Sequence, residues 1–312
     1  MPVGVLLALF AYSLWAIGDA IIKGFTGSAM SVFEINFFIN IFSIVALPFA
    51  RQPEDRWADI FKLKHPLLIH LRAVLYTAGT IAFVFAVTEI EFAETYSLVF
   101  LTPLFLTALS LFVLKERVGT LRWILTVASF IGVLVVVRPG FAEVGLGHLA
   151  AIVCALCAAG GNVILRAIAS NEKKERQFSI IAVNLAYQLV VAGILMIGSF
   201  VWLSPDQLLR LAIVGLLGGA AQILVVRAML RTPASHFGPT QYVQIIWAVV
   251  LGTFFFEEHL DIIGYSGLVL IVAAGVATIF SDGAQARIAG CWTEFRVRRD
   301  VDEVNRVDGR EG

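Results

Sequence analysis

The chain has 312 residues, of which 59% are apolar and 15% charged, and its mean hydropathy is +0.87. Soluble domains are roughly 45–50% apolar and about 25% charged, so this composition excludes a soluble globular fold and indicates a protein embedded in a lipid bilayer. The formal net charge of zero provides no basic field for nucleic acid, so we expect no nucleic-acid partner.

The predicted elements are helices that cross the bilayer. Such a helix needs about 20 mainly apolar residues. In chain order the sequence predicts ten of them, at residues 3–23, 31–50, 66–88, 93–114, 120–138, 147–168, 178–203, 208–230, 235–256 and 262–280. The final stretch is polar and mixed in charge, which is typical of a solvated tail. We therefore predict an all-α integral membrane protein.

The basic residues predict how these segments are oriented. Nearly all of the 23 Lys and Arg residues lie in the even-numbered connections and in the tail. Only three basic residues lie in the odd-numbered connections, namely Lys23, Arg138 and Arg210. Because cytoplasmic loops are enriched in Lys and Arg, we expect a multi-pass protein of the inner (cytoplasmic) membrane with both termini in the cytoplasm.

Two parts of the first half match parts of the second half. Residues Gly4–Lys23 align without gaps on Gly147–Arg166, and Glu116 aligns on Glu258 at nearly the same offset. Each half has five segments, an odd number, so the halves must insert in opposite orientations. We predict an inverted repeat.

The predicted units are a first five-helix repeat, a second five-helix repeat and a polar cytoplasmic tail. Their bounds are residues 1–140, 141–281 and 282–312. An inverted repeat suits a protein that opens alternately to two sides around one central site, and it argues against a channel built from symmetric subunits.

Short motifs recur in both halves. In the first half they are Ala93-Glu94-Thr95, Leu101-Thr102-Pro103-Leu104, Leu114-Lys115-Glu116-Arg117 and Arg138-Pro139-Gly140. In the second half they are Tyr242 to Trp247, Phe256-Glu257-Glu258 and Gly264 to Gly275. Together with the repeat, these motifs make residues 3–280 resemble the EamA-type transporters of the drug/metabolite transporter superfamily.

The resemblance implies a secondary transporter that moves a small organic metabolite by alternating access between two inverted repeats. The pattern Asp19-Ala20…Lys23 is more similar to the branch that contains riboflavin and S-adenosylmethionine transporters. An exporter of drugs or amino acids and a riboflavin- or S-adenosylmethionine-type importer are the alternatives. Many relatives have an Arg in the middle of helix two after a start that contains Glu, whereas here Glu34 is followed by Asn36, Ile39 and Asn40, with no Arg.

Ionisable side chains within the bilayer are the strongest functional candidates, because each costs roughly 2.5–3.5 kcal/mol on insertion scales. Asp19 and Lys23 lie four residues apart on one helix face and can form an ion pair. Alternatively, Asp19 faces the central cavity and binds a cationic group, or couples transport to protons together with Glu34. Arg72 either snorkels to the interface or attracts an anionic group.

Aromatic and amide side chains complete the predicted substrate pathway. Its residues are Tyr12, Trp15, Asp19, Asn36, Arg72, Tyr96, Phe100, Asn162, Gln222, Tyr242 and Gln244. We expect segments one, three, four, six, eight and nine to surround the cavity. Pro103 and Pro239 are predicted to break segments four and nine beside it.

An intramembrane enzyme is the main rival class. None of the five His residues belongs to an H-E-x-x-H motif, and neither a G-x-S-x-G motif nor a paired-aspartate motif is present. We therefore predict no enzyme activity, no catalytic site, no cofactor and no metal. The expected partners are the lipid bilayer and a small-molecule substrate, and the oligomeric state stays open.

Overall fold

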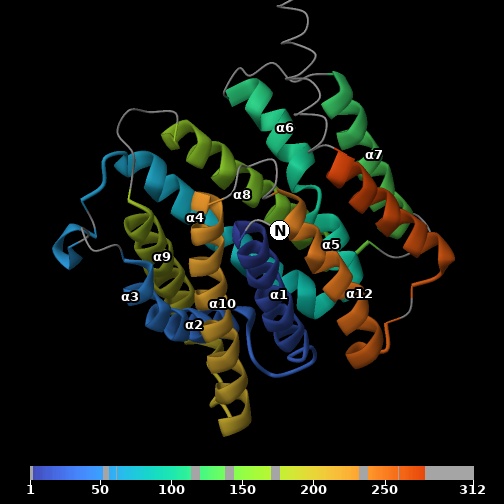
Figure 1. Cartoon of the computed structure of the whole chain (residues 1–312). Coiled ribbons are helices and arrows are strands. Elements are labelled where there is room, and N and C mark those ends of the chain that lie inside the picture. Colours follow the sequence, from blue (N-terminus) through green and yellow to red (C-terminus); the bar gives the residue numbers. More distant parts are fainter. Residues whose placement is uncertain are drawn as a thin grey trace, which may run out of the picture.

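The structure, a computed structural model, describes residues 3–51, 56–60, 62–113, 120–137, 144–169, 176–231, 238–258 and 260–277. Over these residues it is helical and has no strand. Figure 1 shows the helices packed side by side in one bundle. The predicted tail, residues 282–312, lies outside the described residues.

The helices of the first half follow the predicted segments closely. They are α1 (Val3–Lys23), α2 (Val32–Ser43), η1 (Ile44–Ala46), α3 (Leu47–Ala50), η2 (Trp57–Asp59), α4 (Pro66–Glu89), α5 (Phe92–Val99), α6 (Thr102–Val113) and α7 (Thr120–Val137). The predicted second segment is therefore continued by a 3₁₀ turn and a short helix.

The second half contains the remaining helices. They are α8 (Leu146–Ala169), α9 (Gln177–Met196), η3 (Ile197–Ser199), α10 (Pro205–Arg231), η4 (Gly238–Tyr242), α12 (Val243–Phe256) and a last helix, Ile262–Ala277. The predicted seventh segment, 178–203, is too long, because helical structure ends at Ser199. The chain leaves the helix there, and the backbone N–H of Val201 donates to Glu34 Oε1 at 3.1 Å.

Seven helical stretches in the described part of the chain are long and apolar enough to cross a membrane, and three further apolar helices are shorter. The short ones are Trp123–Val136, Thr240–Phe256 and Ile262–Ala277. Many large apolar side chains on the outside of the bundle are exposed, among them Phe10, Phe112 and Phe254. In water such a surface would be unfavourable, whereas lipid accommodates it. The protein is thus a multi-pass, all-helical membrane protein.

Two of the predicted segments are interrupted. The fourth segment is α-helical to Val99, turns at Phe100 and Leu101, and resumes at Thr102 as α6. Proline has no backbone N–H, so residue 103 cannot donate to the carbonyl of Val99 four residues earlier, which disfavours a continuous helix through this point. The ninth segment begins as the 3₁₀ helix η4 before it becomes α12. The predicted break before Pro103 is therefore confirmed, but none of the described residues at it lines the cavity described below.

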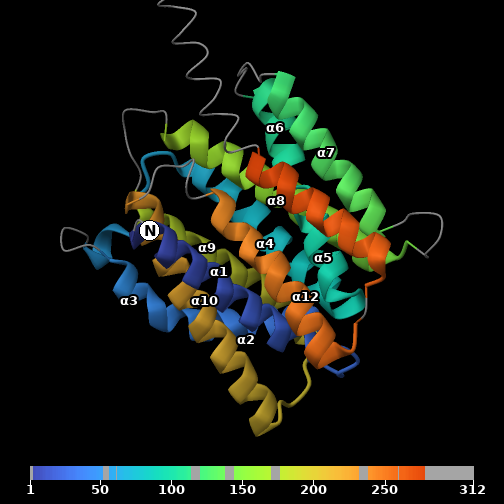
Figure 2. The same cartoon turned by 45° about the vertical axis from the view of Figure 1, so that its right-hand side comes forward.

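Glycines allow α10 to pack closely on α2. A Cβ atom on Gly215 would lie 2.5 Å from the carbonyl oxygen of Ile39, and one on Gly219 would lie 2.5 Å from Ala46 Cβ. The Ser43 hydroxyl, on α2, donates to the Gly215 carbonyl at 2.9 Å. Figure 2 shows α2 and α10 next to one another. Small residues at such contacts are typical of helix packing in membranes.

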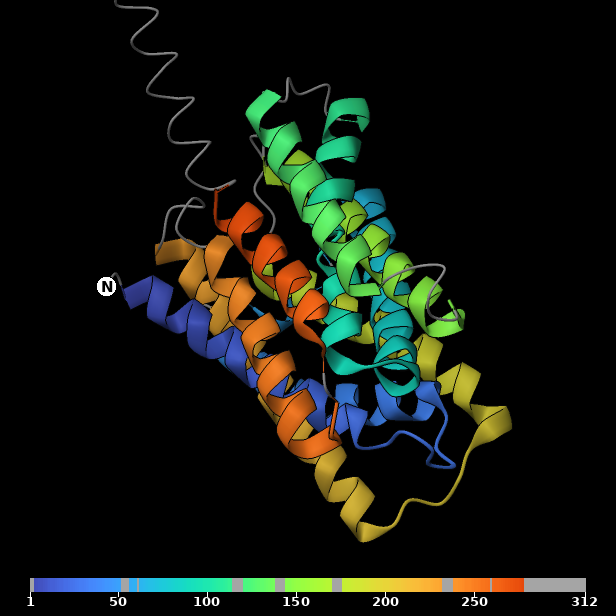
Figure 3. The ribbon, with the colours of Figure 1, turned by 90° about the vertical axis from the view of Figure 1, so that its right-hand side faces the viewer.

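The helix contacts link the two halves throughout. Helix α1 packs on α10 and α12, while α8 packs on α4 and α6. Helix α2 packs on α9 and α10, and α9 also packs on α4. Figure 3 shows these helices interleaved, with no separation of the first half from the second. The bundle is therefore built mainly from contacts between the halves.

We name the two ends of the bundle after residues that lie there. At the Lys23 end, Lys23 of α1 contacts Glu258 beyond α12, and the first turn of α5 contacts the first turn of α8 through Glu94 and His148. At the Asp59 end, Asp59 lies 3.5 Å from Arg176 at the start of α9. Helices α1 and α8 therefore run in opposite directions, because α1 ends and α8 begins at the Lys23 end.

Candidate substrate cavity

A cavity of about 180 Å³ lies inside the bundle. Its walls are formed by α1, α2, η1, α3, α4, α9 and α10. The prediction that segments one, three and eight surround it agrees with the structure. Segments two and seven, which are α2 and α9, also line the cavity. Segments four, six and nine, which were expected to line it, contribute none of the described lining residues.

Asp19 supplies the charge of the cavity. It lies on α1 one turn after Trp15, and both residues line the cavity together with Gly18 and Ile22. The α-helical repeat places these four residues on one face. Among the lining residues that the structure describes, Asp19 is the one Asp, Glu, Lys, Arg or His. A cationic group that entered the cavity would therefore find a single carboxylate to pair with.

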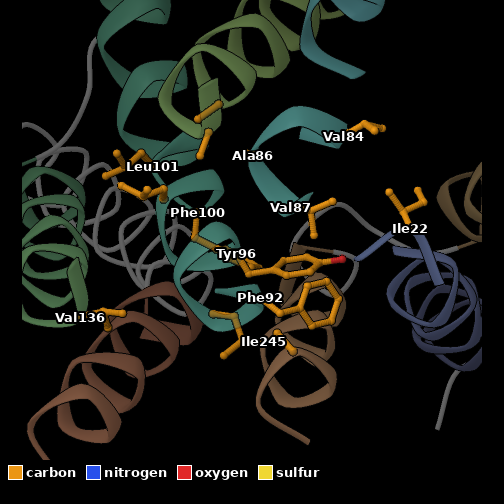
Figure 4. Packing of buried hydrophobic residues seen from close by; sticks show 14 of the residues in the cluster. Ile22, Val84, Ala86, Val87, Phe92, Tyr96, Phe100, Leu101, Val136 and Ile245 are labelled. Atoms are coloured by element: carbon orange, nitrogen blue, oxygen red, sulfur yellow. The ribbon is translucent and has the colours of Figure 1, made fainter. Parts of the chain in front are cut away.

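Residues of α5 and α12 hold the Asp19 carboxylate through two successive hydrogen bonds. The Tyr96 hydroxyl of α5 donates a hydrogen bond to Asp19 Oδ2, and Gln244 Nε2 of α12 donates to the Tyr96 oxygen at 3.3 Å. Figure 4 shows Tyr96 extending from α5 toward α1, with the Phe92 ring beside it. Tyr96 and Gln244, both predicted pathway residues, thus reach the cavity through Asp19.

Amide and hydroxyl groups line the other walls. Asn36, Asn40 and Ser43 come from α2, Asn184 and Gln188 from α9, and Gln222 from α10. Three aromatic rings, those of Trp15, Tyr76 and Phe83, add apolar surface. A mostly apolar cavity with a few converging polar groups is the usual form of a small-molecule site.

The structure places the remaining predicted pathway residues outside the cavity lining. Tyr12 is buried in a cluster with Ala221 and Val225 of α10. Phe100 and Tyr242 stack on each other at the interruptions of their two segments, with ring centroids 5.0 Å apart.

Arg72 and Asn162 also lie away from the lining. The Arg72 guanidinium lies 5.7 Å from the centre of the Tyr76 ring, a residue that does line the cavity. Its Nε and Nη1 atoms are buried without a hydrogen-bond partner among the described residues. Asn162, at the position that aligns with Asp19, is exposed on α8. The repeat therefore does not bring a second polar group to the cavity at this position.

Glu34 takes a structural place at the start of α2. Its backbone N–H donates to the Ser31 hydroxyl at 3.2 Å, and its Oε2 accepts from the Ser31 N–H at 3.3 Å, which is a capping box. Its other oxygen, Oε1, accepts from the N–H of Val201. Glu34 has no exposed surface and does not line the cavity.

An ion pair joins the two halves at the Lys23 end. Lys23 Nζ lies 3.1 Å from Glu258 Oε1, and it also donates to the carbonyl oxygen of Ile90. Glu258 Oε2 accepts from the backbone N–H of Phe92 at 2.7 Å, so it caps the first turn of α5. Both charged side chains are about nine-tenths buried.

The backbone after α12 brings Glu258 into this position. Glu257 has a φ of 55°, in the left-handed region, and the Glu258 N–H returns to the carbonyl oxygen of Gly252 at 3.0 Å. A left-handed residue just after the last turn is a common way for a helix to end, and here it turns the chain back toward α12. A Cβ on Gly252 would lie 2.9 Å from Glu258 Oε2, so the glycine makes room for the carboxylate.

Further acidic groups gather at the same end. Glu94 Oε1 accepts a hydrogen bond from His148 Nε2 at 3.0 Å, since His148 Nδ1 accepts from the Gly145 N–H. Burial, together with the nearby carboxylates of Glu258 and Glu94, raises the pKa of Glu91. Among the residues described, no group of three or more His, Cys, Asp or Glu is arranged to hold a metal ion.

Comparison with known proteins agrees with this architecture. Residues 2–138 and 145–280 each match the EamA-like transporter family. The S-adenosylmethionine uptake transporter of Rickettsia conorii is 27% identical over 267 residues, which cover 84% of this chain and 87% of that protein. The pseudopaline exporter of Pseudomonas aeruginosa is 25% identical over 279 residues, which cover 88% of this chain and 95% of that protein.

A solved crystal structure has a similar fold. It superimposes with a TM-score of 0.64 at 17% sequence identity, over 90% of this chain and 98% of its own. The family and the named relatives are transporters and not enzymes. With both halves of the chain matched, this protein belongs to the EamA-like transporter family, within the drug/metabolite transporter superfamily.

Proposed function

We propose that the chain is a secondary transporter that carries a small cationic organic metabolite across the inner membrane. The observation that carries this proposal is the Asp19 carboxylate, the single charged group among the described residues that line the cavity. A carboxylate within the bilayer is costly unless it is paired or protonated. Tyr96 supplies a hydrogen bond but no positive charge, which leaves the balancing charge to the cargo or a proton.

We propose that Asp19, and not Glu34, carries any coupling to protons. Asp19 is open to the cavity, whereas each Glu34 oxygen already accepts a backbone N–H. Competition between a proton and a cationic substrate for one carboxylate is a simple means of coupling their movements. The substitution of Glu34 by Gln should preserve the pH profile of transport, since an amide oxygen can still accept one of these bonds.

The mechanism that we propose is alternating access between two inverted five-helix repeats, residues 1–140 and 141–281. Helix contacts support it. Helix α1 is the counterpart of α8, α10 of α4, and α12 of α6. The contact of α1 with α10 therefore corresponds to that of α8 with α4, and the contact of α1 with α12 corresponds to that of α8 with α6. The opposite directions of α1 and α8 agree with inversion. Ten membrane helices with both termini in the cytoplasm complete this proposal.

In this scheme the Lys23–Glu258 contact closes the cavity at the Lys23 end. It joins α1, α4, α5 and α12 through one ion pair and two hydrogen bonds to backbone groups. Asp19 lies one turn before Lys23 on α1, so binding at the carboxylate and closure of this end involve the same helix. Lining residues extend from Ile22 to Ala50, which supports access from the Asp59 end.

The relatives suggest the first substrate to test. The transporter from Rickettsia conorii takes up S-adenosylmethionine, and we propose that the cargo of this chain is similar, with its cationic group at Asp19. Export is the second candidate direction, because the relative from Pseudomonas aeruginosa is an exporter and aligns over most of the chain.

Uptake into liposomes tests the proposal. Purified full-length protein is reconstituted, and entry of labelled S-adenosylmethionine is measured with and without a pH gradient. We expect Asp19→Asn to lower the rate at least tenfold and Asp19→Glu to restore part of it. Asp206→Asn is the matched control, because Asp206 is exposed at the start of α10 and, within the described part of the chain, pairs with Arg210 one turn later. A wild-type rate in Asp19→Asn would refute the role of this carboxylate.

A further inference from the structure

Three asparagines face the same cavity as Asp19. Asn36 and Asn40 lie one turn apart on α2, and Asn184 lies on α9, which packs against α2. Each is buried, with 4%, 5% and 6% of its surface exposed, respectively. Buried amide groups ordinarily have hydrogen-bond partners, so the bonds that these three make are informative.

The two asparagines of α2 use their donors on their own helix. Asn36 Nδ2 donates to the Val32 carbonyl at 2.9 Å, and Asn40 Nδ2 donates to the Asn36 carbonyl at 2.8 Å. These contacts fix the amide orientation, because an oxygen in place of Nδ2 would oppose a carbonyl oxygen. Neither Oδ1 atom accepts a hydrogen bond from the described residues. Both oxygens are therefore acceptors left for a ligand.

The asparagine of α9 provides a third acceptor. Asn184 Oδ1 is buried and has no hydrogen-bond partner in the described part of the chain. Gln188 Nε2, one turn later, donates to the backbone carbonyl of Asn184 and not to its side chain. A buried carbonyl without a donor is unfavourable, and a ligand N–H would relieve that cost.

The aromatic rings favour a different ligand. Trp15, Tyr76 and Phe83 also line the cavity, and aromatic faces attract quaternary ammonium groups, which have no N–H. Open amide oxygens find no N–H to accept from such a group, whereas they can each accept a hydrogen bond from an ammonium or amino N–H. The two chemistries therefore predict opposite preferences between an amine and its fully methylated form.

We infer that the cavity selects cations that carry several N–H donors, and that Asn36, Asn40 and Asn184 determine this specificity. The inference rests on the proposed function, because it takes Asp19 as the partner of the positive charge. The carboxylate selects ligands with a positive charge, and the amide oxygens favour ligands with several N–H donors. Sites built from specific acceptors discriminate strongly against ligands that leave those acceptors unpaired.

Two matched cations test the inference. 2-Phenylethylamine, as its ammonium ion, and its N,N,N-trimethyl form share one ring and one charge but have three N–H donors and none, respectively. Their dissociation constants are measured with purified full-length protein in detergent, by calorimetry or by the rise in melting temperature that binding produces. We expect the ammonium to bind at least tenfold more tightly to the wild type.

Variants assign the preference to residues. In Asn36→Leu/Asn40→Leu, and separately in Asn184→Leu, we expect the ratio of the two constants to fall at least threefold. Asn162→Leu, which changes an exposed amide outside the cavity, should keep the wild-type ratio. The melting temperature of each unliganded variant shows whether it is folded, and the single α9 variant serves if the double variant is not.

The outcomes separate this inference from the proposed function. Equal binding of both probes to the wild type, or a ratio that the asparagine variants leave unchanged, would overturn the inference. If Asp19→Asn still weakened both probes alike, the cationic site would stand without the donor selectivity. Binding of neither probe would also overturn the inference, while S-adenosylmethionine uptake would decide the proposed function by itself.

Discussion

Lys23 Nζ lies 3.1 Å from Glu258 Oε1, although the two residues belong to different halves of the chain. The pair is buried, Lys23 also bonds the carbonyl oxygen of Ile90 after α4, and Glu258 also bonds the N–H of Phe92 at the start of α5. Removing one partner of a buried pair leaves the other charge uncompensated, which typically costs about 3–5 kcal/mol. The contact is therefore a sensitive point for testing how this end of the cavity is closed.

Glu258→Gln is predicted to open the Lys23 end more often. The amide oxygen can still cap Phe92, but the attraction to Lys23 is lost. A cysteine placed at Ile22, which lines the cavity, reports access in a chain whose natural cysteines are replaced. We expect a membrane-impermeant thiol reagent applied from the Lys23 side to label it about tenfold faster, and the melting temperature to fall.

Asp206→Asn provides the comparison for this experiment. It breaks another ion pair at the same end, between Asp206 and Arg210 at 2.8 Å, but both partners are substantially exposed. Exposed pairs contribute only about 0–1 kcal/mol. If this change accelerated labelling as much as Glu258→Gln, the buried pair would have no special part in closure.

Tyr96→Phe is predicted to lower transport several-fold while leaving the fold intact. The variant keeps the ring, whose centroid lies 5.2 Å from that of the Phe92 ring. It loses the hydroxyl that bonds Asp19 and Gln244. Initial rates over a range of substrate concentrations measure KM and maximal rate separately. We expect mainly a higher KM, because Tyr96 positions the carboxylate and does not itself line the cavity.

Tyr187→Phe is the matched control for Tyr96→Phe. It also removes one hydroxyl from a membrane helix, but the partner is His70 at 3.0 Å and the contact is exposed. Wild-type kinetics are expected. A change in KM of the same size in both variants would show that the effect is a general consequence of losing a tyrosine hydroxyl.

Gly215→Ala is predicted to destabilise the bundle, whereas Gly218→Ala is not. The first Cβ would lie 2.5 Å from the Ile39 carbonyl, so α2 and α10 must move apart. Overpacking of this kind costs about 1–3 kcal/mol. The nearest atom to a Cβ on Gly218 is Ser43 Oγ at 4.0 Å. Melting temperatures in detergent compare the two, and equal values would contradict the close approach of these helices.

Glu91→Gln is predicted to stabilise the protein at neutral and higher pH. Burial and the carboxylates of Glu258 and Glu94 raise the pKa of Glu91, so the folded state favours its protonated form. The ionised form therefore lowers stability as the pH rises through this raised pKa, and no such loss exists well below the ordinary pKa of Glu. Solvent screening at this exposed residue limits the gain to about 0–1 kcal/mol.

The pH dependence is the deciding measurement for Glu91→Gln. Melting temperatures of the wild type and the variant are compared at about pH 4 and about pH 8. The melting temperature of the variant should exceed that of the wild type at the higher pH and differ little from it at the lower pH. A gain of the same size at both values would mean that the effect does not come from the charge of Glu91.

The helices could be predicted from the sequence because their signals are local. A run of apolar residues defined α1 from Val3 to Lys23, and Pro103 predicted the break that ends α5. The correction at the seventh segment has a tertiary cause. Apolar residues continue past Ser199, but the Val201 N–H bonds to Glu34 of a distant helix, which no local pattern reveals.

The candidate site was less predictable because it depends on which faces meet. Helical spacing allowed Asp19 to pair with Lys23, yet the structure joins Asp19 to Tyr96, and Lys23 to Glu258. Trp15, Asp19, Asn36 and Gln222 were predicted and do line the cavity.

Other lining residues were outside the predicted pathway. Asn40 and Tyr76 are cavity residues that the prediction omitted. A signal existed for both, since Asn40 follows Asn36 by one helical turn, and Tyr76 shares a face with Thr80 and Phe83. Periodicity identifies such a face but not the helix that it meets, so it does not decide which helices form the walls of the cavity.

The aligned positions Asp19 and Asn162 differ in both charge and surroundings, one in the cavity and the other exposed. At this pair of aligned positions the two halves thus provide one acidic group and not a symmetric pair. In the proposed cycle, a cation arriving from either side of the membrane would meet the same carboxylate. The site itself would then have no built-in direction, and net flux would follow the concentration gradients of cargo and protons.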